Sequence, residues 1–323
     1  MRYRELGRSG ITVSEIGYGG WGIGQNAWKG ATEAESVRAL HRAIDLGVNL
    51  IDTARGYGRS EHVIGRALRE RAAGADGVFV ATKAGPKIPA GPESRGVDPM
   101  DAYPGSHLRE SVETSLAALG LERIDLLQLH VWHDEWTGRG DWLETVEALK
   151  REGKIGLFGI SVNDHQPDNA LALVRTGVLD TVQVIYNIFE QAPSDALLPA
   201  CQEYGVGVIA RVALDEGGLT GRIKPGVTFP EDDWRNWYFR DDRPAQVARH
   251  VGAIVDDLGI APDEIAGTAL RFALGGTAVS SVIVGMRDVR NVERNAAVGD
   301  QPPLTAEQFA LLAKHRWQRN FYT

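Results

Sequence analysis

The chain has 323 residues, a length that suits either two smaller domains or one α/β barrel. With 43% hydrophobic and 24% charged residues it has the composition of a folded globular protein, which excludes an extensively disordered chain. A net charge of −8 argues against a general nucleic-acid surface and favours a small-molecule partner. Cys201 is the only cysteine, which excludes an internal disulfide and a cysteine metal cluster, so we expect a cytoplasmic protein. No window offers the roughly 20 apolar residues of a membrane span, and no export signal is visible.

Short apolar runs alternate with amphipathic segments from residue 15 to about residue 297. The runs look buried on both faces, which is typical of parallel strands, and the longer segments have helical periodicity. Thr32 and Glu35 form a capping box that begins one helix, 32–46, and another helix is expected over 107–118. The predicted strands are 15–18, 48–51, 77–81, 125–129, 156–160, 181–185, 207–210 and 280–284.

Eight parallel strands separated by crossover helices fit a (β/α)8 barrel better than an open doubly wound sheet. We therefore predict an α/β fold, a single-domain TIM barrel over residues 1–323, with extra C-terminal helices that include 305–315. Residues 1–14 contain a Ser-Gly turn between β-prone runs, which predicts an N-terminal β-hairpin that closes the bottom of the barrel. Two long segments, 85–105 and 222–244, are expected to lie over the barrel mouth.

Four ionisable side chains stand at the ends of three successive predicted strands. Asp52 and Tyr57 follow the strand 48–51, Lys83 follows 77–81, and His130 follows 125–129. Each of them alone has a common structural explanation, such as a turn former or a solvated charge. Together, at the strand ends where barrel enzymes place their chemistry, these four residues predict a catalytic tetrad.

Three motifs around the tetrad resemble the aldo-keto reductase superfamily. They are Asp-Thr-Ala-x-x-Tyr-Gly at 52–58, Ala-Thr-Lys at 81–83 and Leu-Leu-Gln-Leu-His at 126–130, and the resemblance extends over nearly the whole chain. It implies reduction of a carbonyl by hydride from a nicotinamide, with Tyr57 as the proton donor. An ammonium favours the phenolate, so we expect Lys83 to lower the pKa of Tyr57 while Asp52 holds Lys83 in place. His130 is expected to orient the substrate oxygen.

The nicotinamide cofactor that the resemblance implies would lie across the barrel mouth. Residues 19–24 lack the helix and the later acidic residue of a dinucleotide fingerprint, so a Rossmann domain is not expected. Ser161, Asn163 and Gln183 match positions that hold the carboxamide, which paired donors and acceptors fix well. Gly285 stands before a predicted helix start, a natural anion site, and Arg287 is expected at a 2′-phosphate, which favours NADPH over NADH. The further expected cofactor contacts are Gly20, Trp21, Asp52, Arg211, Leu214, Gly217, Leu219, Gly221, Asn291 and, at the adenine, Asn295.

Arg211 departs from the family pattern. Many relatives place an aromatic residue after the seventh strand to stack on the nicotinamide, and Arg211 stands there instead. A guanidinium can lie flat on a ring, but a cation beside an oxidised, cationic nicotinamide should weaken binding of that form. The sequence therefore predicts a bias towards the reduced cofactor. The glycine-rich loop 214–221 that follows is expected to cover the cofactor.

Other functions remain open from the sequence. His130 and His133, followed by Asp134 and Glu135, resemble the start of a metal site, which makes a metal-dependent barrel hydrolase the rival enzyme. Lys83 is a poor neighbour for a cation, so we expect no metal. The tetrad run in the oxidative direction would make an NAD(P)-dependent sugar 1-dehydrogenase. A cofactor-sensing, non-catalytic subunit is an alternative of another class, against which the intact tetrad argues.

The sequence does not name the substrate beyond a small carbonyl compound or a sugar. Polar residues such as Asn26 and Asp134 would suit a hydroxylated substrate. We therefore predict an NADPH-dependent carbonyl reductase that works without metal. The sequence gives no prediction of the oligomeric state. The aromatic residues that could wall a substrate pocket are Trp234, Trp237, Tyr238 and Phe239. The expected substrate contacts are Trp21, Arg55, Tyr57, His130, Trp132 and His133.

Overall fold

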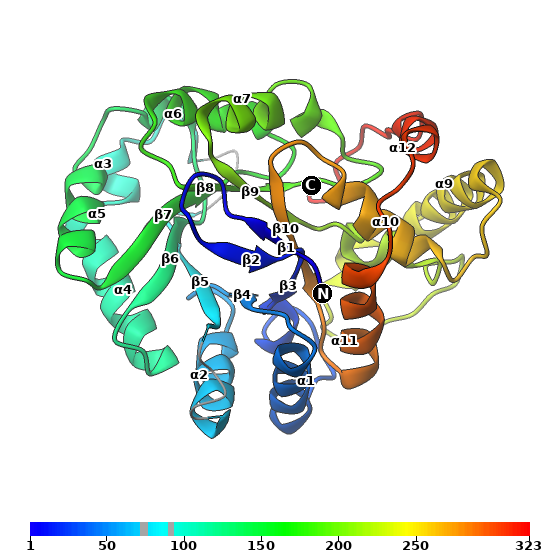
Figure 1. Ribbon diagram of the computed structural model, residues 1–323, viewed down its shortest axis with the longest axis horizontal. Coiled ribbons are helices and arrows are strands. Elements are labelled where there is room, and N and C mark those ends of the chain that lie inside the picture. Colours follow the sequence, from blue (N-terminus) through cyan, green and yellow to red (C-terminus); the bar gives the residue numbers. More distant parts are fainter. Residues whose placement is uncertain (72–76, 90–93) are drawn as a thin grey trace.

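The computed structural model describes residues 1–71, 77–89 and 94–323. Within these residues, eight parallel strands close a barrel in the order β10-β3-β4-β5-β6-β7-β8-β9, and helices surround it (Figure 1). The predicted α/β barrel is confirmed. Its strands are β3 (Ile16–Gly19), β4 (Leu50–Asp52), β5 (Phe79–Ala84), β6 (Ile124–Leu129), β7 (Ile155–Ser161), β8 (Thr181–Ile185), β9 (Gly207–Arg211) and β10 (Val279–Gly285).

The barrel strands divide their side chains between two apolar cores. Leu50 and Leu126 belong to a small cluster inside the barrel, whereas their neighbours Ile51 and Leu127 belong to the larger cluster between the barrel and the helices. This follows from the period of two along a strand, which sends successive side chains to opposite faces. Because both faces are covered, most strand positions are apolar, and the polar residues described below stand near the carboxyl ends of the strands.

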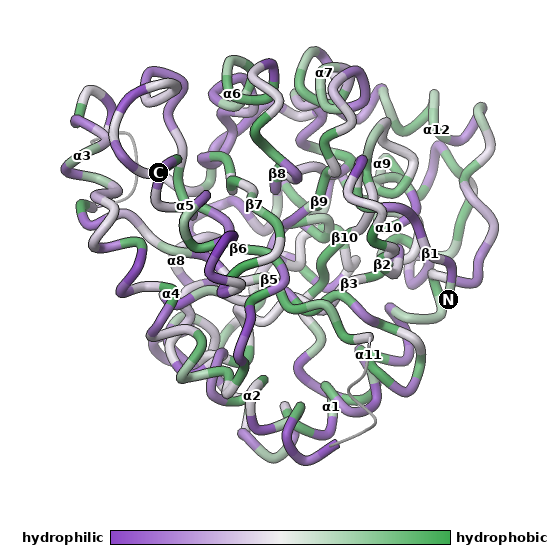
Figure 2. Tube along the Cα trace, turned by 60° about the vertical axis from the view of Figure 1, so that its left-hand side comes forward, coloured by the Kyte–Doolittle hydropathy of each residue, from purple (hydrophilic) through white to green (hydrophobic). Residues whose placement is uncertain are grey.

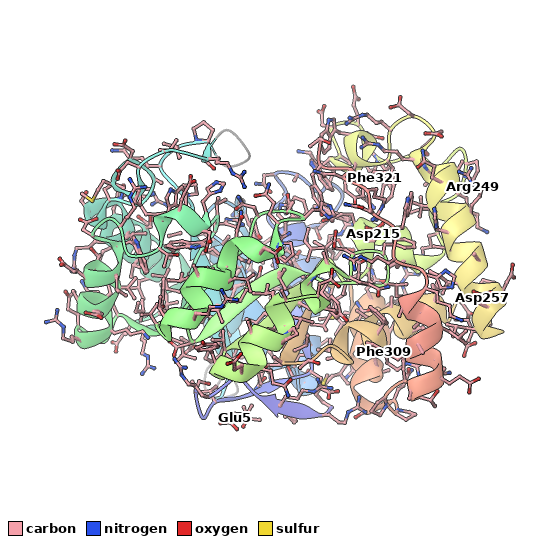
Figure 3. The ribbon with its side chains drawn as sticks, turned by 90° about the horizontal axis from the view of Figure 1, so that it is seen from above. Glu5, Asp215, Arg249, Asp257, Phe309 and Phe321 are labelled. Atoms are coloured by element: carbon pink, nitrogen blue, oxygen red, sulfur yellow. The ribbon has the colours of Figure 1, made fainter. Side chains whose placement is uncertain are left out.

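An antiparallel hairpin of β1 (Tyr3–Glu5) and β2 (Thr12–Ser14) closes the barrel at the amino ends of its strands. Leu6 and Val13 join the cluster inside the barrel, and Ser281 Oγ donates to Ser14 O at 2.8 Å. Gly7, at a φ of 57°, approaches β9 so closely that a Cβ there would lie 2.3 Å from Gly207 N. Figure 3 shows Glu5 of the hairpin at one end of the molecule and Phe321 towards the other. The predicted plug is confirmed.

The helices cover the outside of the barrel with one apolar face each. Thr32 caps the first of them and forms the predicted capping box with Glu35, in which each side chain accepts from the other residue's backbone N–H. In Figure 2 the outer helices carry both hydrophobic and hydrophilic stretches, as expected for elements with one face in water. The helices are α1 (Glu33–Asp45), α2 (Ser60–Arg71), α3 (Pro99–Ala102), α4 (Gly105–Leu119), α5 (Trp142–Arg151), α6 (Leu171–Thr176), α7 (Leu197–Tyr204), α8 (Arg235–Tyr238), α9 (Arg243–Leu258), α10 (Ile265–Leu274), α11 (Val289–Ala296) and α12 (Ala306–Ala313).

Several segments differ in detail from the sequence-based expectation. β4 ends at Asp52 and β5 continues to Ala84, so Asp52 and Lys83 lie within their strands and not after them. The two long segments contain short helices, α3 in 85–105 and α8 in 222–244, and residues 90–93 lie outside the described residues. After α12 the chain returns to the barrel mouth, where Tyr322 reaches the loop after β9. Among the described residues, no helix is both long and apolar enough to span a bilayer.

Candidate active site

The alternation of side chains along the strands aims polar groups into the barrel mouth. Leu50 points into the barrel, so Asp52, two positions on, points the same way. In β5 Ala81 points into the barrel, so Lys83, two positions further along the strand, also points inward. The register pairs Asp52 with Ala81, which brings the carboxylate and the lysine to the same end of two neighbouring strands. The same alternation of side chains along the other strands points four more residues inward: Gln128, Ser161, Gln183 and Arg211.

Lys83 and Asp52 form a buried ion pair. Lys83 Nζ donates to Asp52 Oδ2 at 2.6 Å and to Thr53 O at 2.9 Å. The other carboxylate oxygen, Asp52 Oδ1, accepts from Gln183 Nε2 at 2.8 Å and from Gln128 Nε2 at 3.2 Å. A buried ion pair is stable only when such additional hydrogen bonds satisfy the groups that have left water. The ammonium is therefore held in one position.

Tyr57 lies over this pair on the loop that follows β4. Its ring centroid is 4.9 Å from Lys83 Nζ, and its Oη is 3.4 Å from His130 Nε2. The loop lies so close to the turn after β3 that a Cβ at Gly24 would meet Tyr57 O at 1.9 Å, and Gly58 has a φ of 56°. Glycine alone satisfies both conditions without strain. The structure thus brings the four residues of the predicted tetrad together.

Burial decides the protonation of the two groups that face the cavity. It raises the pKa of Tyr57 above the ordinary value of 10, and the charge of Lys83 opposes this rise. The sequence led us to expect a net lowering of the Tyr57 pKa. The loss of hydration destabilises the phenolate more than the charge of Lys83 stabilises it, so the pKa rises instead. Burial, and then the charges of Lys83 and Arg211, hold the pKa of His130 well below its usual range. At neutral pH Tyr57 is a neutral proton donor and His130 a neutral imidazole.

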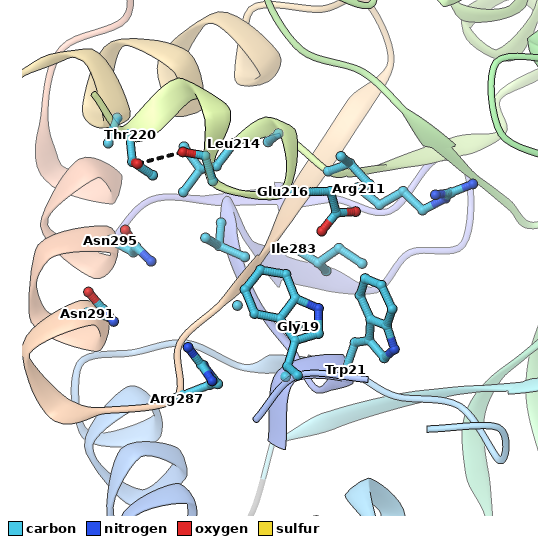
Figure 4. Close-up of a pocket in the computed structure, with 18 of the residues that line it drawn as sticks. Gly19, Trp21, Arg211, Leu214, Glu216, Thr220, Ile283, Arg287, Asn291 and Asn295 are labelled. Carbon is cyan, nitrogen blue, oxygen red and sulfur yellow. Dashed lines mark hydrogen bonds between the residues drawn. The ribbon is translucent and has the colours of Figure 1, made fainter. Parts of the chain in front are cut away.

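The tetrad opens into a cavity of about 1140 Å³ at the barrel mouth. This exceeds the range of about 300–1,000 Å³ that suits a drug-sized ligand, so it has room for two ligands together. Figure 4 shows Arg211, Glu216 and Trp21 towards one end and Arg287, Asn291 and Asn295 towards the other. The predicted cofactor contacts that line it are Gly20, Trp21, Asp52, Gln183, Arg211, Leu214, Gly217, Gly221, Gly285, Arg287, Asn291 and Asn295.

Gln183 has hydrogen-bonding capacity that fits a carboxamide. Its Nε2 donates to Asp52, while its Oε1 is buried and has no hydrogen-bond partner in the described part of the chain. A buried acceptor without a partner costs about 1–3 kcal/mol. Because Gln183 lines the cavity, the NH₂ group of a bound carboxamide would satisfy this oxygen. The residues present therefore fit a nicotinamide at this end.

Arg287 dominates the far end of the cavity. Its Nη1 donates to Lys29 O at 2.7 Å, and its guanidinium carbon lies 5.3 Å from the ring centroid of Trp28. The helix start that we expected to bind an anion is that of α11, and the Asp288 carboxylate caps it, accepting from Asn291 N at 2.9 Å. With a carboxylate already at the helix start, Arg287 and the backbone at Gly285 are the groups that can bind an anion there.

Some predicted residues lie behind the cavity wall. Trp132 is fully buried, with ring centroids 5.8 Å and 5.1 Å from those of Trp136 and Trp142. His133 Nε2 pairs with Ser94 Oγ at 2.7 Å, and no group of three His, Cys, Asp or Glu side chains within the described ranges could hold a metal ion. In the described chain, the predicted cofactor and substrate residues that do not line the cavity are Arg55, Trp132, His133, Ser161, Asn163 and Leu219.

An indole wall lies next to the tetrad. Trp21 lies 6.2 Å from Tyr57 and 5.2 Å from Trp234 between ring centroids. Of the four aromatic residues proposed to wall the pocket, Trp234 lines it, Trp237 is 39% exposed to solvent, and the other two are buried behind. The wall therefore comes partly from Trp21 and Trp28, on the loop after β3.

The cavity residues that sequence reasoning missed include Asp164, Glu216 and Tyr322. Glu216 had a local indication, since it stands inside the glycine-rich loop 214–221. Asp164 follows β7, a strand end where the sequence pointed to Ser161 and Asn163 instead. Tyr322 had no local indication, because it reaches the cavity from a segment about a hundred residues further along the chain.

Comparison with known proteins agrees with this geometry. The sequence pattern of the Aldo/keto reductase family matches residues 15–316. The chain belongs to this family. It is 33% identical over 238 residues to an NADH-specific methylglyoxal reductase of Escherichia coli (strain K12), covering 69% of this chain and 70% of the relative. Membership makes the protein an NAD(P)-dependent oxidoreductase.

Solved structures of the family superpose over almost the whole chain. The aldo-keto reductase AKR11C1 from Bacillus halodurans, in its holo form, matches with a TM-score of 0.76 at 26% identity, covering 98% of this chain and 96% of that one. The glycerol dehydrogenase AKR11B4 from Gluconobacter oxydans matches with a TM-score of 0.75 at 27% identity, covering 97% and 94%. One of these relatives is named a reductase and another a dehydrogenase, so family membership leaves the direction of the reaction open.

Proposed function

We propose that this family member is a carbonyl reductase that uses NADPH to reduce an aldehyde or ketone to an alcohol, with residues 1–323 acting as one domain. The observation that carries the proposal is the buried Lys83–Asp52 pair behind Tyr57, with His130 Nε2 at 3.4 Å from the phenol oxygen. This arrangement supports proton donation to a single point at the end of the cavity. We also propose a cytoplasmic location, since the sole cysteine, Cys201, is a buried free thiol.

In the proposed mechanism each residue has one role. A reduced nicotinamide, when bound, supplies hydride to the carbonyl carbon. Tyr57 Oη donates its proton to the carbonyl oxygen, and the ammonium of Lys83 stabilises the phenolate that remains. His130, neutral at working pH, binds the same oxygen through Nε2 and fixes its position without adding a charge. The role of Asp52 is to hold the ammonium of Lys83 in place, through the 2.6 Å contact.

NADPH is proposed over NADH because of Arg287. Burial lowers the pKa of this guanidinium from its usual value, which indicates that part of its hydration has been removed. A partly desolvated guanidinium gains more from a phosphate dianion than one in bulk water does. The backbone oxygen of Lys29 and the ring of Trp28 hold the side chain in place for that contact. One relative is named NADH-specific, so NADH is the alternative.

Oxidation of a sugar at its anomeric carbon is the second candidate, favoured by the acceptor groups beside the tetrad and by a structural neighbour named as a glycerol dehydrogenase. In that direction Tyr57 must first lose its proton to act as a base. Because burial raises the pKa of Tyr57, the base form is scarce at neutral pH. Reduction is therefore favoured near pH 7, and oxidation gains as the pH rises.

The proposal is tested by following the loss of NADPH absorbance, and separately of NADH, with aldehydes, ketones and sugars. Tyr57→Phe should lower kcat/KM by about 10²–10⁴-fold, since it removes the general acid, while NADPH binding measured by fluorescence persists. Tyr186→Phe is the matched control, because this buried hydroxyl pairs with Ser194 outside the cavity. Equal activity of Tyr57→Phe would refute the tetrad assignment. Binding of cofactor without turnover by the wild type would support a cofactor-sensing role instead.

A further inference from the structure

A second polar cluster borders the same end of the cavity as the tetrad and has no part in the mechanism above. It consists of Arg211, Asp164, Glu216 and Tyr322, all of which line the cavity. Arg211 Nη2 donates to Asp164 Oδ1 at 2.7 Å and to Val162 O at 2.9 Å. Tyr322 Oη donates to Glu216 Oε1 at 2.8 Å. Figure 4 shows the Glu216 carboxyl between Arg211 and the indole of Trp21.

The backbone that presents Glu216 is strained and is held from outside the loop. Asp215 and Glu216 have φ values of 50° and 54°, a region that costs about 1–3 kcal/mol for residues other than glycine. Asp215 is fixed by an ion pair with Arg319 and by a hydrogen bond from Tyr238 Oη at 3.2 Å. Contacts from α8 and the C-terminal segment thus maintain a conformation that aims the Glu216 side chain into the cavity.

The cluster has acceptor capacity that the protein itself does not use. In each carboxyl group one oxygen accepts a hydrogen bond, Glu216 Oε1 from Tyr322 and Asp164 Oδ1 from Arg211. The other oxygens, Glu216 Oε2 and Asp164 Oδ2, make no hydrogen bond with the described residues. The guanidinium of Arg211 is already paired with Asp164, and the Glu216 carboxyl lies in the same cluster, so the cluster disfavours phosphates and carboxylates and suits neutral groups that donate hydrogen bonds. The cluster lies near the proton donor, because the indole of Trp21, towards which Figure 4 shows the Glu216 carboxyl, has its ring centroid 6.2 Å from that of Tyr57.

We propose that Glu216 and Asp164 form a hydroxyl-binding subsite beside Tyr57, held in position by Tyr322 and Arg211. The subsite accepts hydrogen bonds from the hydroxyl groups of a sugar-like part of a ligand. This deepens the proposed function and rests on it, since the ligand must lie next to the tetrad. The hydroxyls have two possible sources, a polyhydroxylated carbonyl substrate or the ribose of the cofactor.

The test compares erythrose with butanal, which has the same four-carbon chain without hydroxyls. The assays are run at pH 8, because the raised pKa of Glu216, about 7, leaves the carboxyl mostly ionised only above that value. Glu216→Gln keeps the shape of the side chain and its contact with Tyr322 but removes the charged acceptor. If substrate hydroxyls fill the subsite, this variant should lower kcat/KM for erythrose about 10-fold or more and change butanal less than about 2-fold, since hydrogen bonds to charged groups are worth about 1.5–3 kcal/mol. Tyr322→Phe should shift the same ratio in the same direction by a smaller factor. Asp195→Asn is the control, because Asp195 pairs with Arg316 near the C-terminus, outside the cavity.

A second measurement, the Kd of NADPH from fluorescence, separates the two sources. If the ribose fills the subsite, Glu216→Gln should raise this Kd about 10-fold, and the erythrose-to-butanal ratio should stay constant. If neither the Kd nor the ratio changes, the subsite does not exist. Should the wild type reduce neither aldehyde, the proposed function fails, and the Kd alone then decides the subsite: a rise in Glu216→Gln supports it and an unchanged value overturns it.

Discussion

The two halves of the barrel mouth are built in different ways. On the side of β4, β5 and β6, Asp52 and Lys83 come from strand ends fixed by the barrel itself, and the hydrogen bonds of Asp52 stay within it. On the side of β9, the cavity wall consists of the strained loop 215–220 and of Trp234 and Tyr322 from distant segments. The first half holds the reacting groups rigidly, and the second surrounds the ligand. The chemistry is therefore tied to the fold, whereas the shape of the pocket can change with the loops.

Breaking the buried ion pair gives the largest expected effect. Lys83→Met leaves the carboxylate of Asp52 buried without its cation, which should cost about 3–5 kcal/mol of stability. The double variant Lys83→Met with Asp52→Asn removes both charges, so it should recover much of that loss while remaining inactive. Urea unfolding measures the first effect and NADPH consumption the second. Equal stability of the single and double variants would show that the pair is not the rigid element of this half.

The contrast between the halves also explains what the sequence predicted. The eight strands follow from apolar runs with turn residues between them, and Asp52 and Lys83 follow from their place at strand ends. These features are local, so periodicity reveals them. The reach of Tyr322 to Glu216 is set by tertiary packing across about a hundred residues, and no local pattern encodes it. The direction of the Tyr57 pKa was mispredicted for the same reason, because burial depends on the assembled fold.

In the β9 half the next largest effect is a pH dependence of stability. Burial raises the pKa of Glu216 from 4.5 to about 7, with the Tyr322 hydroxyl and Arg211 opposing and Asp215 and Asp164 adding to the rise. Below pH 4.5 the carboxyl is protonated in both the folded and the unfolded state. Between pH 4.5 and 7 it ionises mainly in the unfolded chain, so stability falls as the pH rises and the loss is complete above pH 7.

Glu216→Gln should remove this contribution. The difference in unfolding free energy between wild type and variant should fall by about 3 kcal/mol from pH 4 to pH 8, at about 1.4 kcal/mol per pKa unit. Urea titrations of both proteins across that range measure it. A constant difference would mean that Glu216 is well hydrated, and that the loop is not held as tightly as the structure shows.

At the far end of the cavity, Arg287→Ala tests whether cofactor choice depends on one guanidinium. The loss of a charge-assisted contact worth about 1.5–3 kcal/mol should raise the Kd of NADPH about 10–100-fold and leave that of NADH nearly unchanged. Arg290→Ala is the control, because Arg290 is on the same segment but exposed and outside the cavity wall. Parallel losses for both cofactors would show that Arg287 acts on cavity shape and not on a phosphate.

The smallest expected effect concerns the charge of Arg211, the residue that replaces the aromatic ring. The sequence predicted that this cation weakens binding of the oxidised nicotinamide, but the structure pairs it with Asp164 at 2.7 Å, which offsets much of its charge. We therefore expect only a weak bias in the wild type. Asp164→Asn should expose the charge and raise the Kd of the oxidised cofactor about 3-fold relative to the reduced one, a change below 1 kcal/mol.

Arg211→Tyr should move that ratio in the opposite direction, since it removes the cation and provides a ring for stacking. Fluorescence titrations with both cofactor forms at two salt concentrations measure the effect, which must shrink at the higher salt if it is electrostatic. If Asp164→Asn changes both affinities equally, the Arg211–Asp164 pair positions the wall of the cavity without acting on the nicotinamide charge. The preference for one redox form of the cofactor would then depend on the rigid half of the mouth, where the ammonium of Lys83 lies 4.9 Å from the ring centroid of Tyr57.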